Sequence, residues 1–203
     1  MTPPRASRSR REFLKAAVAA GSTAALAACT DLAADGAPSG DPSAKPARQH
    51  AWNDYTRTDD HGNVQLPRHQ PLIYASLRAD GPPTESDRDT VEAALGVLDE
   101  AYEWSHDGLL FSAAYSPAYF DRFDEGVPES VDLPQPDALS PFEDPDFDTQ
   151  DVLVHLASDR ADVVLAAEHA LTGELDEVNG VSVEATLADV LTVDSRRTGF
   201  VGA

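Results

Sequence analysis

The chain has 203 residues, of which 36 are Asp or Glu and 15 are Lys or Arg, so its formal net charge is −21 at pH 7. This charge argues against nucleic acid or an anionic lipid surface as a partner, because both are bound through clustered Lys and Arg. Cys29 is the only cysteine, which excludes an internal disulfide. A surface so rich in carboxylates is typical of proteins that work in concentrated salt, where screening suppresses the repulsion between like charges.

The N-terminus carries the pattern of a twin-arginine export signal. The pair is Arg10 and Arg11, in the string Ser-Arg-Arg-Glu-Phe-Leu-Lys, and an Ala-rich stretch follows over residues 16–25. That stretch is too short to span a bilayer permanently. Twin-arginine export moves folded proteins, which slightly favours a cofactor inserted before export, although a protein that folds rapidly in salt would use the same route. We therefore expect export by this route without inferring a cofactor from it.

The export signal ends in a string that resembles a lipobox, Leu26-Ala27-Ala28-Cys29. In such a string the small residues admit a peptidase and the cysteine sulfur receives the lipid. We expect residues 1–28 to be a signal peptide and Cys29 to be lipidated, which would anchor the protein on the extracytoplasmic face of the membrane. The alternative for Cys29 is a buried or reactive thiol.

Composition divides the rest of the chain into three parts. Residues 29–48 contain little to bury and predict a disordered tether. Residues 49–69 hold scattered aromatic and aliphatic residues and predict an irregular arm that lies on the domain. Residues 70–203 are long enough for one domain with its own core. Within them, residues 125–150 form an acidic, proline-rich loop of the kind that is functional or peripheral.

Strand and helix patterns alternate in the first half of the domain. Thr84, with acidic residues in the turn after it, marks a helix start, and apolar residues then recur at helical spacing. The predicted elements are, in chain order, a strand over residues 72–77, a helix over 85–104, a strand over 109–115 and a helical turn over 117–123.

The second half repeats this order. A strand over residues 152–157 precedes a helix with Ser158 or Asp159 as its N-cap and Gly173 as its terminator, and the best strand in the tail covers residues 190–193 and ends near Arg196. Two β-α-β units predict an α+β, ferredoxin-like split βαβ fold, in which two helices cover one face of a four-stranded antiparallel sheet. The other face then needs a partner to cover it.

Several segments resemble the N-terminal half of dye-decolorizing (DyP-type) haem peroxidases. They are the strand–helix–strand unit from Leu72, the string over residues 110–120, the strand over residues 151–159 and the closing Arg196-Arg197-Thr198-Gly199-Phe200. The resemblance implies one half of a dimeric α+β barrel type fold and, in the complete protein, haem b and peroxide-dependent oxidation. The family's haem site uses a proximal His, a distal Arg and an Asp in a Gly-x-x-Asp-Gly string. That string is absent from these 203 residues, so no catalytic or cofactor-binding residue is carried over and this segment alone is expected to hold no haem.

The other candidate groups favour structural roles. His155 lies in mid-strand and could be a haem or metal ligand, but a half-buried, hydrogen-bonded histidine is the more common case. No set of residues has metal-ligand spacing, so no metal site is expected. The sets considered as ligands are His169 beside Glu168; Asp59, Asp60 and His61; His106 and Asp107; and the calcium-like Asp144, Asp146 and Asp148, which lack the glycine and glutamate of such a loop. A separate group of aromatic residues could line a pocket or belong to the core: Tyr115, Tyr119, Phe120 and Phe123.

Two functions of different class remain open. The first is an exported lipoprotein that forms the N-terminal half of a haem peroxidase-like protein, whose missing C-terminal half carries the haem. The second is a non-catalytic, ferredoxin-like interaction or dimerisation module on the cell surface. In the first case the missing half covers the open sheet face, and in the second case a second copy or another exported protein does.

Overall fold

The computed structural model describes residues 36–128, 130–131, 137–145, 147 and 149–201. Arg10, Arg11 and Cys29 lie outside the described residues, so export and lipidation stay predictions. Within the described ranges no helix has the length and apolar character needed to cross a membrane.

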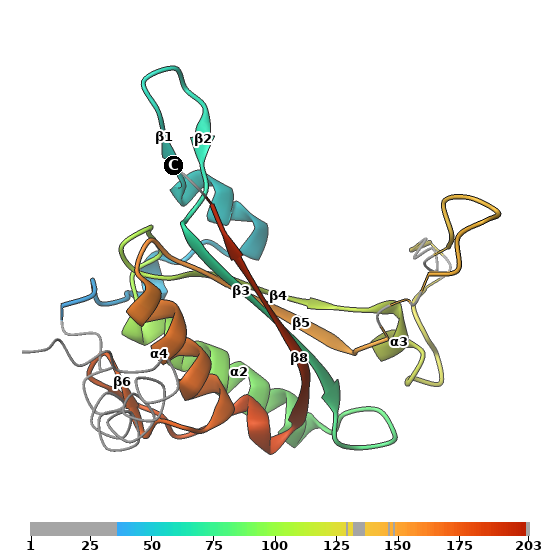
Figure 1. Ribbon diagram of the computed structural model, residues 1–203. Coiled ribbons are helices and arrows are strands. Elements are labelled where there is room, and N and C mark those ends of the chain that lie inside the picture. Colours follow the sequence, from blue (N-terminus) through green and yellow to red (C-terminus); the bar gives the residue numbers. More distant parts are fainter. Residues whose placement is uncertain (1–35, 129, 132–136, 146, 148, 202–203) are drawn as a thin grey trace, which may run out of the picture.

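A four-stranded antiparallel sheet with the strand order β4-β5-β3-β8 forms the centre of the molecule. Helices α2 and α4 lie on the same face of this sheet (Figure 1). The elements in chain order are β3 (His69–Leu77), α2 (Glu85–Ala101), β4 (Leu110–Tyr115), β5 (Val152–Ala157), α4 (Ala161–Thr172) and β8 (Leu191–Phe200). Two β-α-β units with this strand order define the ferredoxin-like fold, so the predicted fold class is confirmed.

The core lies between the sheet and the two helices. Ile73 and Ala75 of β3 alternate with less buried neighbours and face the helices, as do Val154 and Leu156 of β5. The helices contribute residues of one stripe each, and all of them are almost fully buried: Ala94, Leu98 and Ala101 from α2, and Val163, Ala166, Ala167, Ala170 and Leu171 from α4. Alanine at so many of these positions lets the helices approach the sheet closely.

The helix termini agree in part with the sequence. Thr84 forms a capping box with Asp87 at the start of α2, and Gly173 ends α4 with a φ of 79°. The start of α4 differs from the prediction, because its N-cap is Arg160 rather than Ser158 or Asp159. The Asp159 carboxylate is not free to cap the helix, since it accepts a hydrogen bond from the backbone N–H of Arg68 and pairs with Arg57.

Residues 36–48 form a strap against the end of α2, whereas the sequence predicts a disordered tether there. The Gly40 N–H donates to the Glu100 carbonyl, and the Glu103 N–H donates to the Pro38 carbonyl. A side chain at Gly40 could not fit, because its Cβ would lie 1.9 Å from the Asp99 carbonyl oxygen. Polar backbone contacts of this kind leave no trace in hydrophobic periodicity, which is why the strap escapes sequence analysis.

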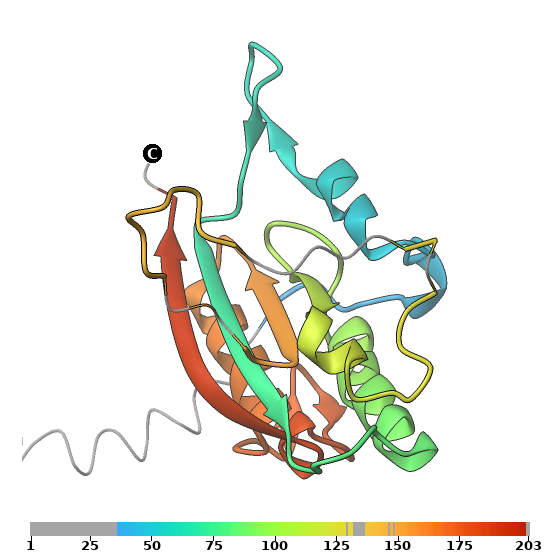
Figure 2. The same ribbon diagram turned by 90° about the vertical axis from the view of Figure 1, so that its right-hand side faces the viewer.

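The predicted arm over residues 49–69 contains short regular elements. They are the 3-10 helix η2 (Gln49–Tyr55) and the hairpin of β1 (Arg57–Thr58) and β2 (Val64–Gln65), which extends away from the body of the molecule (Figure 2). The tail also differs from expectation, because β8 runs on to Phe200 through both arginines. An edge strand exposed to solvent tolerates charged side chains, so charge alone does not end it. A small hairpin of β6 (Glu177–Val178) and β7 (Val181–Ser182) precedes it.

A buried ion pair fixes the long loop to the sheet. Asp151, directly before β5, is 2% exposed, and both its carboxylate oxygens lie 2.8 Å from the Arg122 guanidinium. The same carboxylate accepts the Leu77 N–H at 2.8 Å, and Arg122 also donates to the Ala79 carbonyl. These bonds hold together the end of β3, the start of β5 and the segment that follows the short helix α3 (Pro117–Phe120).

We predict that Asp151→Ala lowers the free energy of unfolding by about 3 kcal/mol, because it leaves the Arg122 guanidinium and the Leu77 N–H without their acceptor in a desolvated place. Denaturant unfolding in molar salt would measure this. Asp121→Ala is the matched control, since this neighbouring carboxylate is exposed, and it should change the value by less than about 0.5 kcal/mol. Equal effects of both substitutions would contradict a specific role for Asp151.

Candidate functional site

The sheet face opposite the helices carries no helix over most of its length in the described part of the chain (Figure 2). Strand register places two rows of side chains on it, because paired residues of antiparallel strands point to the same side. One row is Ser112, His155, Leu72 and Arg197, and the next is Ala114, Leu153, Tyr74 and Ser195. We call these eight residues, together with Ser76 and Asp194, the open face.

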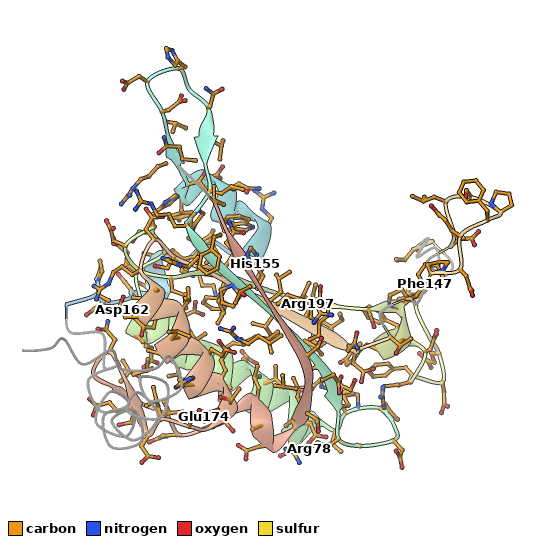
Figure 3. All side chains as sticks on the ribbon, viewed as in Figure 1. Arg78, Phe147, His155, Asp162, Glu174 and Arg197 are labelled. Carbon is orange, nitrogen blue, oxygen red and sulfur yellow. The ribbon has the colours of Figure 1, made fainter. Side chains whose placement is uncertain are left out.

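The arm covers one end of the open face only. The Trp52 ring of η2 lies edge-on to the His155 ring, with 5.8 Å between their centroids. Figure 2 shows η2 beside one end of the sheet, and no described helix crosses the rest of that face. Figure 3 labels His155 and Arg197, which lie away from Asp162 and Glu174 on the helix side. Leu72, Tyr74 and Leu153 are therefore left only partly buried.

The open face is poor in charge, unlike the chain as a whole. Its permanently charged side chains are Asp194, which accepts a hydrogen bond from the Ser76 hydroxyl at 2.5 Å, and Arg197, which forms no ion pair with any described residue. A chain with 36 acidic residues that places one carboxylate on such a face resembles the centre of a protein interface, where charged residues are depleted. One positive and one negative group also make the face electrostatically self-complementary.

His155 is held by neighbours from two elements. Its Nε2 atom lies 3.2 Å from the Gln70 side-chain oxygen of β3, and Trp52 packs against its ring. Partial burial lowers the pKa of His155 below its ordinary value, because desolvation disfavours the charged ring. The predicted alternative of a half-buried, hydrogen-bonded histidine describes this environment.

The residues around His155 do not fit a haem group. His155 lines none of the five principal cavities of the described residues, and its Nε2 atom is already within hydrogen-bond distance of Gln70. The described residues also contain no cluster of three or more His, Cys, Asp or Glu that could hold a metal ion. We therefore derive no chemical step through haem or a metal for this segment.

A groove of about 580 Å³ lies on the helix side of the sheet, between α2, the end of β4 and α3. Its apolar lining includes Val91, Leu95 and Leu191, together with the rings of Tyr115 and Tyr119, whose centroids are 4.3 Å apart and whose planes are tilted by 35°. Burial raises the pKa of both tyrosines, so both are neutral hydroxyls at physiological pH. The sequence allowed these aromatic residues to belong to the core or to line a pocket. Tyr119 does both, because it is buried and also lines the groove.

Lys45 of the strap also lines this groove. Its ammonium group pairs with the Asp99 carboxylate at 2.5 Å and lies 4.8 Å from the Phe111 ring centroid and 5.3 Å from that of Trp104. Apart from Lys15 in the predicted signal it is the only lysine of the chain. The rarity of lysine is the one sequence signal that could have identified this contact.

The remaining predicted candidates have structural partners. His106 is 3% exposed; its Nε2 atom accepts the Arg57 N–H at 3.0 Å, and its Nδ1 atom lies 3.3 Å from the Asp159 carboxylate. Both ring nitrogens are thereby used to hold the arm, and neither is free for a ligand. The Asp59 carboxylate closes the β1–β2 turn by accepting the His61 and Asn63 N–H groups.

Two further candidates give no site. His169 lies 3.8 Å from Glu174 near the end of α4, at a partly exposed position. Of the calcium-like aspartates, Asp146 and Asp148 lie outside the described residues.

We predict that the free energy of unfolding decreases as the pH is lowered below about 6.5, and that His155 accounts for part of this decrease. The pKa of His155 is lower in the folded than in the unfolded chain, so the unfolded state binds more protons as the pH falls. The stability that the neutral His155 ring contributes is therefore complete only above the pKa of the unfolded chain. Denaturant unfolding at pH 5 and pH 7.5 should show a smaller pH dependence for His155→Gln than for the parent protein. His61→Gln, at an exposed turn, is the control; an unchanged pH dependence in His155→Gln would contradict this role.

Structure comparison finds similarity to DyP-type peroxidases, as the sequence suggested. A dye-decolorizing protein from V. cholerae is 15% identical with a TM-score of 0.45, and the match covers 68% of this chain and 42% of that one. DyPB from Rhodococcus jostii is 13% identical with a TM-score of 0.41, and the match covers 68% of this chain and 40% of that one. A DyP-type peroxidase from Streptomyces coelicolor is 16% identical with a TM-score of 0.46, and the match covers 77% of this chain and 44% of that one. This chain thus spans less than half the length of these proteins. At such identities and TM-scores the similarity carries no inference about activity or residues.

The comparison with curated proteins finds no match. The family described as "Family of unknown function (DUF7405)" matches residues 67–203, a range that begins just before β3 and includes the whole sheet and both of its helices. Since this match covers more than half of the chain, the protein belongs to the DUF7405 family.

Proposed function

We propose that this protein is an exported lipoprotein whose ferredoxin-like domain is a docking module, and that the open face is its docking surface. The observation that supports this is the open face itself: two rows of side chains across four strands, low in charge and covered by η2 at one end only. A sheet of this kind is stable as an inner layer, with a second layer on each side.

The occupant that we propose is the open face of a second copy. Two identical faces related by a two-fold axis can bring Arg197 of each copy toward Asp194 of the other, so the surface is self-complementary in charge. Leu72, Leu153 and Tyr74 would supply the apolar centre of such an interface. A strongly acidic partner face would instead be repelled by a chain whose net charge is −21.

Peroxidase activity would apply only if this chain is part of a longer protein. The sequence resemblance implies that a complete relative would oxidise organic donors with hydrogen peroxide through haem b held by a second half. In that case the second half, rather than a second copy, would cover the open face. The described residues of this chain would then provide a wall for the assembly and no group that touches the reacting atoms.

We predict that the purified protein sediments as a dimer in molar salt and that Leu153→Asp makes it monomeric, because a carboxylate in the apolar centre would have to be buried without a partner. Sedimentation velocity over a range of protein concentrations would measure this. Ala93→Asp places the same charge on an exposed position of α2 and should leave the dimer intact. Circular dichroism would show that both variants remain folded.

A parent protein that is monomeric at all concentrations would overturn the choice of a second copy as the occupant. An absorbance spectrum of the same sample after addition of haemin tests whether this segment binds haem. A sharp Soret band that is lost in His155→Ala would show that this segment binds haem, which would contradict the docking function proposed here.

We predict that replacing Arg10 and Arg11 by lysine retains the protein in the cytoplasm, because the translocation machinery recognises the guanidinium pair. Cys29→Ser should instead leave export intact and release the protein from the membrane into the medium. Cell fractionation followed by immunoblotting would distinguish the two variants. Export of the double-lysine variant at the parental level would refute the twin-arginine route, and membrane retention of Cys29→Ser would refute the lipid anchor.

A further inference from the structure

The groove between α2, the end of β4 and α3 has the size and lining of a small-molecule site. Its volume of about 580 Å³ lies within the range of about 300–1,000 Å³ that is usual for such sites. Each of the four strands of the sheet contributes one residue to it, all at the same end of the sheet: Tyr115, Val152, Leu77 and Leu191. The groove is therefore built on regular elements of the fold, which hold a binding surface in place before a ligand arrives.

Two adjacent rows of side chains on α2 form the other wall of the groove. Residues four apart on a helix lie on one stripe, with their Cβ atoms about 5–6 Å apart. One row contains Val91 and Leu95, and the other contains Arg88, Glu92 and Gly96. The second row thus presents a cation, an anion and a bare stretch of backbone in succession.

Nothing in the described residues requires glycine at position 96. Gly96 lies in the interior of α2, where glycine is destabilising relative to alanine, and it is not among the glycines with a positive φ. Apart from the backbone of its own helix, a Cβ at this position would meet no described atom within 4 Å. A glycine that faces an open groove in this way lets a ligand lie directly against the helix backbone.

Two of the charged groups that line the groove have no partner in the part of the chain that the structure describes. Asp99 pairs with Lys45, and the Asp87 carboxylate is used in the capping box of α2. The side chains of Arg88 and Glu92 form no ion pair or hydrogen bond with any described residue, and they do not pair with each other. One positive and one negative group therefore remain available, one helical turn apart.

Tyr119 adds a hydrogen-bonding group beside Arg88. Tyr119 is 8% exposed and lines the groove, and its hydroxyl forms no hydrogen bond with any described residue. Burial raises the pKa of Tyr119, and the positive charge of Arg88 acts in the opposite direction, which indicates that the guanidinium lies near this phenol. Because buried polar groups are normally hydrogen-bonded, an unpaired hydroxyl in a cavity wall indicates a place for a polar ligand atom.

We propose that this groove binds a free α-amino acid with a large apolar side chain. The amino acid's carboxylate accepts hydrogen bonds from the Arg88 guanidinium and the Tyr119 hydroxyl, and its ammonium group donates to the Glu92 carboxylate. Its side chain covers Gly96 and lies against Leu191.

A zwitterion fits this groove better than an ion of either sign. The ammonium and carboxylate groups of an α-amino acid are attached to the same carbon, as the two unpaired charges of the groove lie on adjacent turns of one helix. An anion would be repelled by a chain whose net charge is −21, whereas an amino acid is neutral overall. A simple cation would leave the Arg88 guanidinium without an acceptor.

Three probes that differ only in charge test this assignment. We expect saturation-transfer NMR on the purified full-length protein to show binding of L-phenylalanine with a Kd of about 1 mM or tighter. Phenethylamine lacks the carboxylate and 3-phenylpropionate lacks the ammonium group, so each should bind at least about tenfold more weakly. Equal binding of either analogue, or no saturation transfer to L-phenylalanine well above that concentration, would overturn the proposal.

Substitutions at the bare stretch of α2 test the location of the site. Gly96→Leu should abolish binding, because the new side chain fills the groove, and should raise the midpoint of denaturant unfolding, because leucine is the better helix former. Ala93→Leu, on the exposed side of α2, is the matched control and should leave L-phenylalanine binding unchanged. Binding at the parental level in Gly96→Leu would overturn the groove as the site.

Substitutions of the two unpaired charges test how the ligand is recognised. Arg88→Gln and Glu92→Gln should each weaken L-phenylalanine binding at least about tenfold, whereas Asp89→Asn, at an exposed position outside the groove, should not. Parental affinity in both glutamine variants would refute recognition of a zwitterion. The groove lies on the helix side of the sheet, so these measurements do not depend on whether the open face binds a second copy.

Discussion

The structure depends on the fact that a sheet has two faces and that this chain covers one of them with helices. The alternation of side chains sends Ile73, Ala75, Val154 and Leu156 into a core with α2 and α4, and it sends their neighbours Leu72, Tyr74, Leu153 and His155 to the opposite side. The arm reaches that side through Trp52 at one end. The proposed docking function follows from the uncovered remainder, because half-buried aliphatic and aromatic groups gain most from a second layer.

The acidic composition gives the few cations particular importance. Arg122 holds Asp151 at the junction of β3, β5 and the loop, Arg57 joins the arm to Asp159, and Lys45 attaches the strap to Asp99 and two aromatic rings. Each of these cations fixes a segment that lies outside the central sheet and its two helices. At high salt, exposed ion pairs contribute little to the free energy of unfolding, whereas buried pairs are screened less. The pair of Arg122 with the buried Asp151 is therefore expected to contribute most to stability.

Membership of a family of unknown function and a distant similarity to DyP-type peroxidases leave the chemistry to be argued from the residues. His155 and His106, two histidines weighed as possible ligands from the sequence, both have their ring nitrogens engaged or their rings covered by neighbouring elements. Their contacts join the arm to the sheet. The docking function proposed above therefore rests on the open face and not on a reactive side chain.

The sequence by itself determined the order of strands and helices, the capping box at Thr84, the terminator Gly173 and therefore the ferredoxin-like fold, because these depend on local periodicity and capping chemistry. Only the tertiary structure decided that residues 36–48 pack as a strap, that Asp159 binds Arg68 and Arg57 instead of capping α4, and that β8 continues to Phe200. It also decided which residues share the open face. These features arise from contacts between segments far apart in the chain, where hydrogen bonds and strand register, rather than hydrophobic pattern, select the partner.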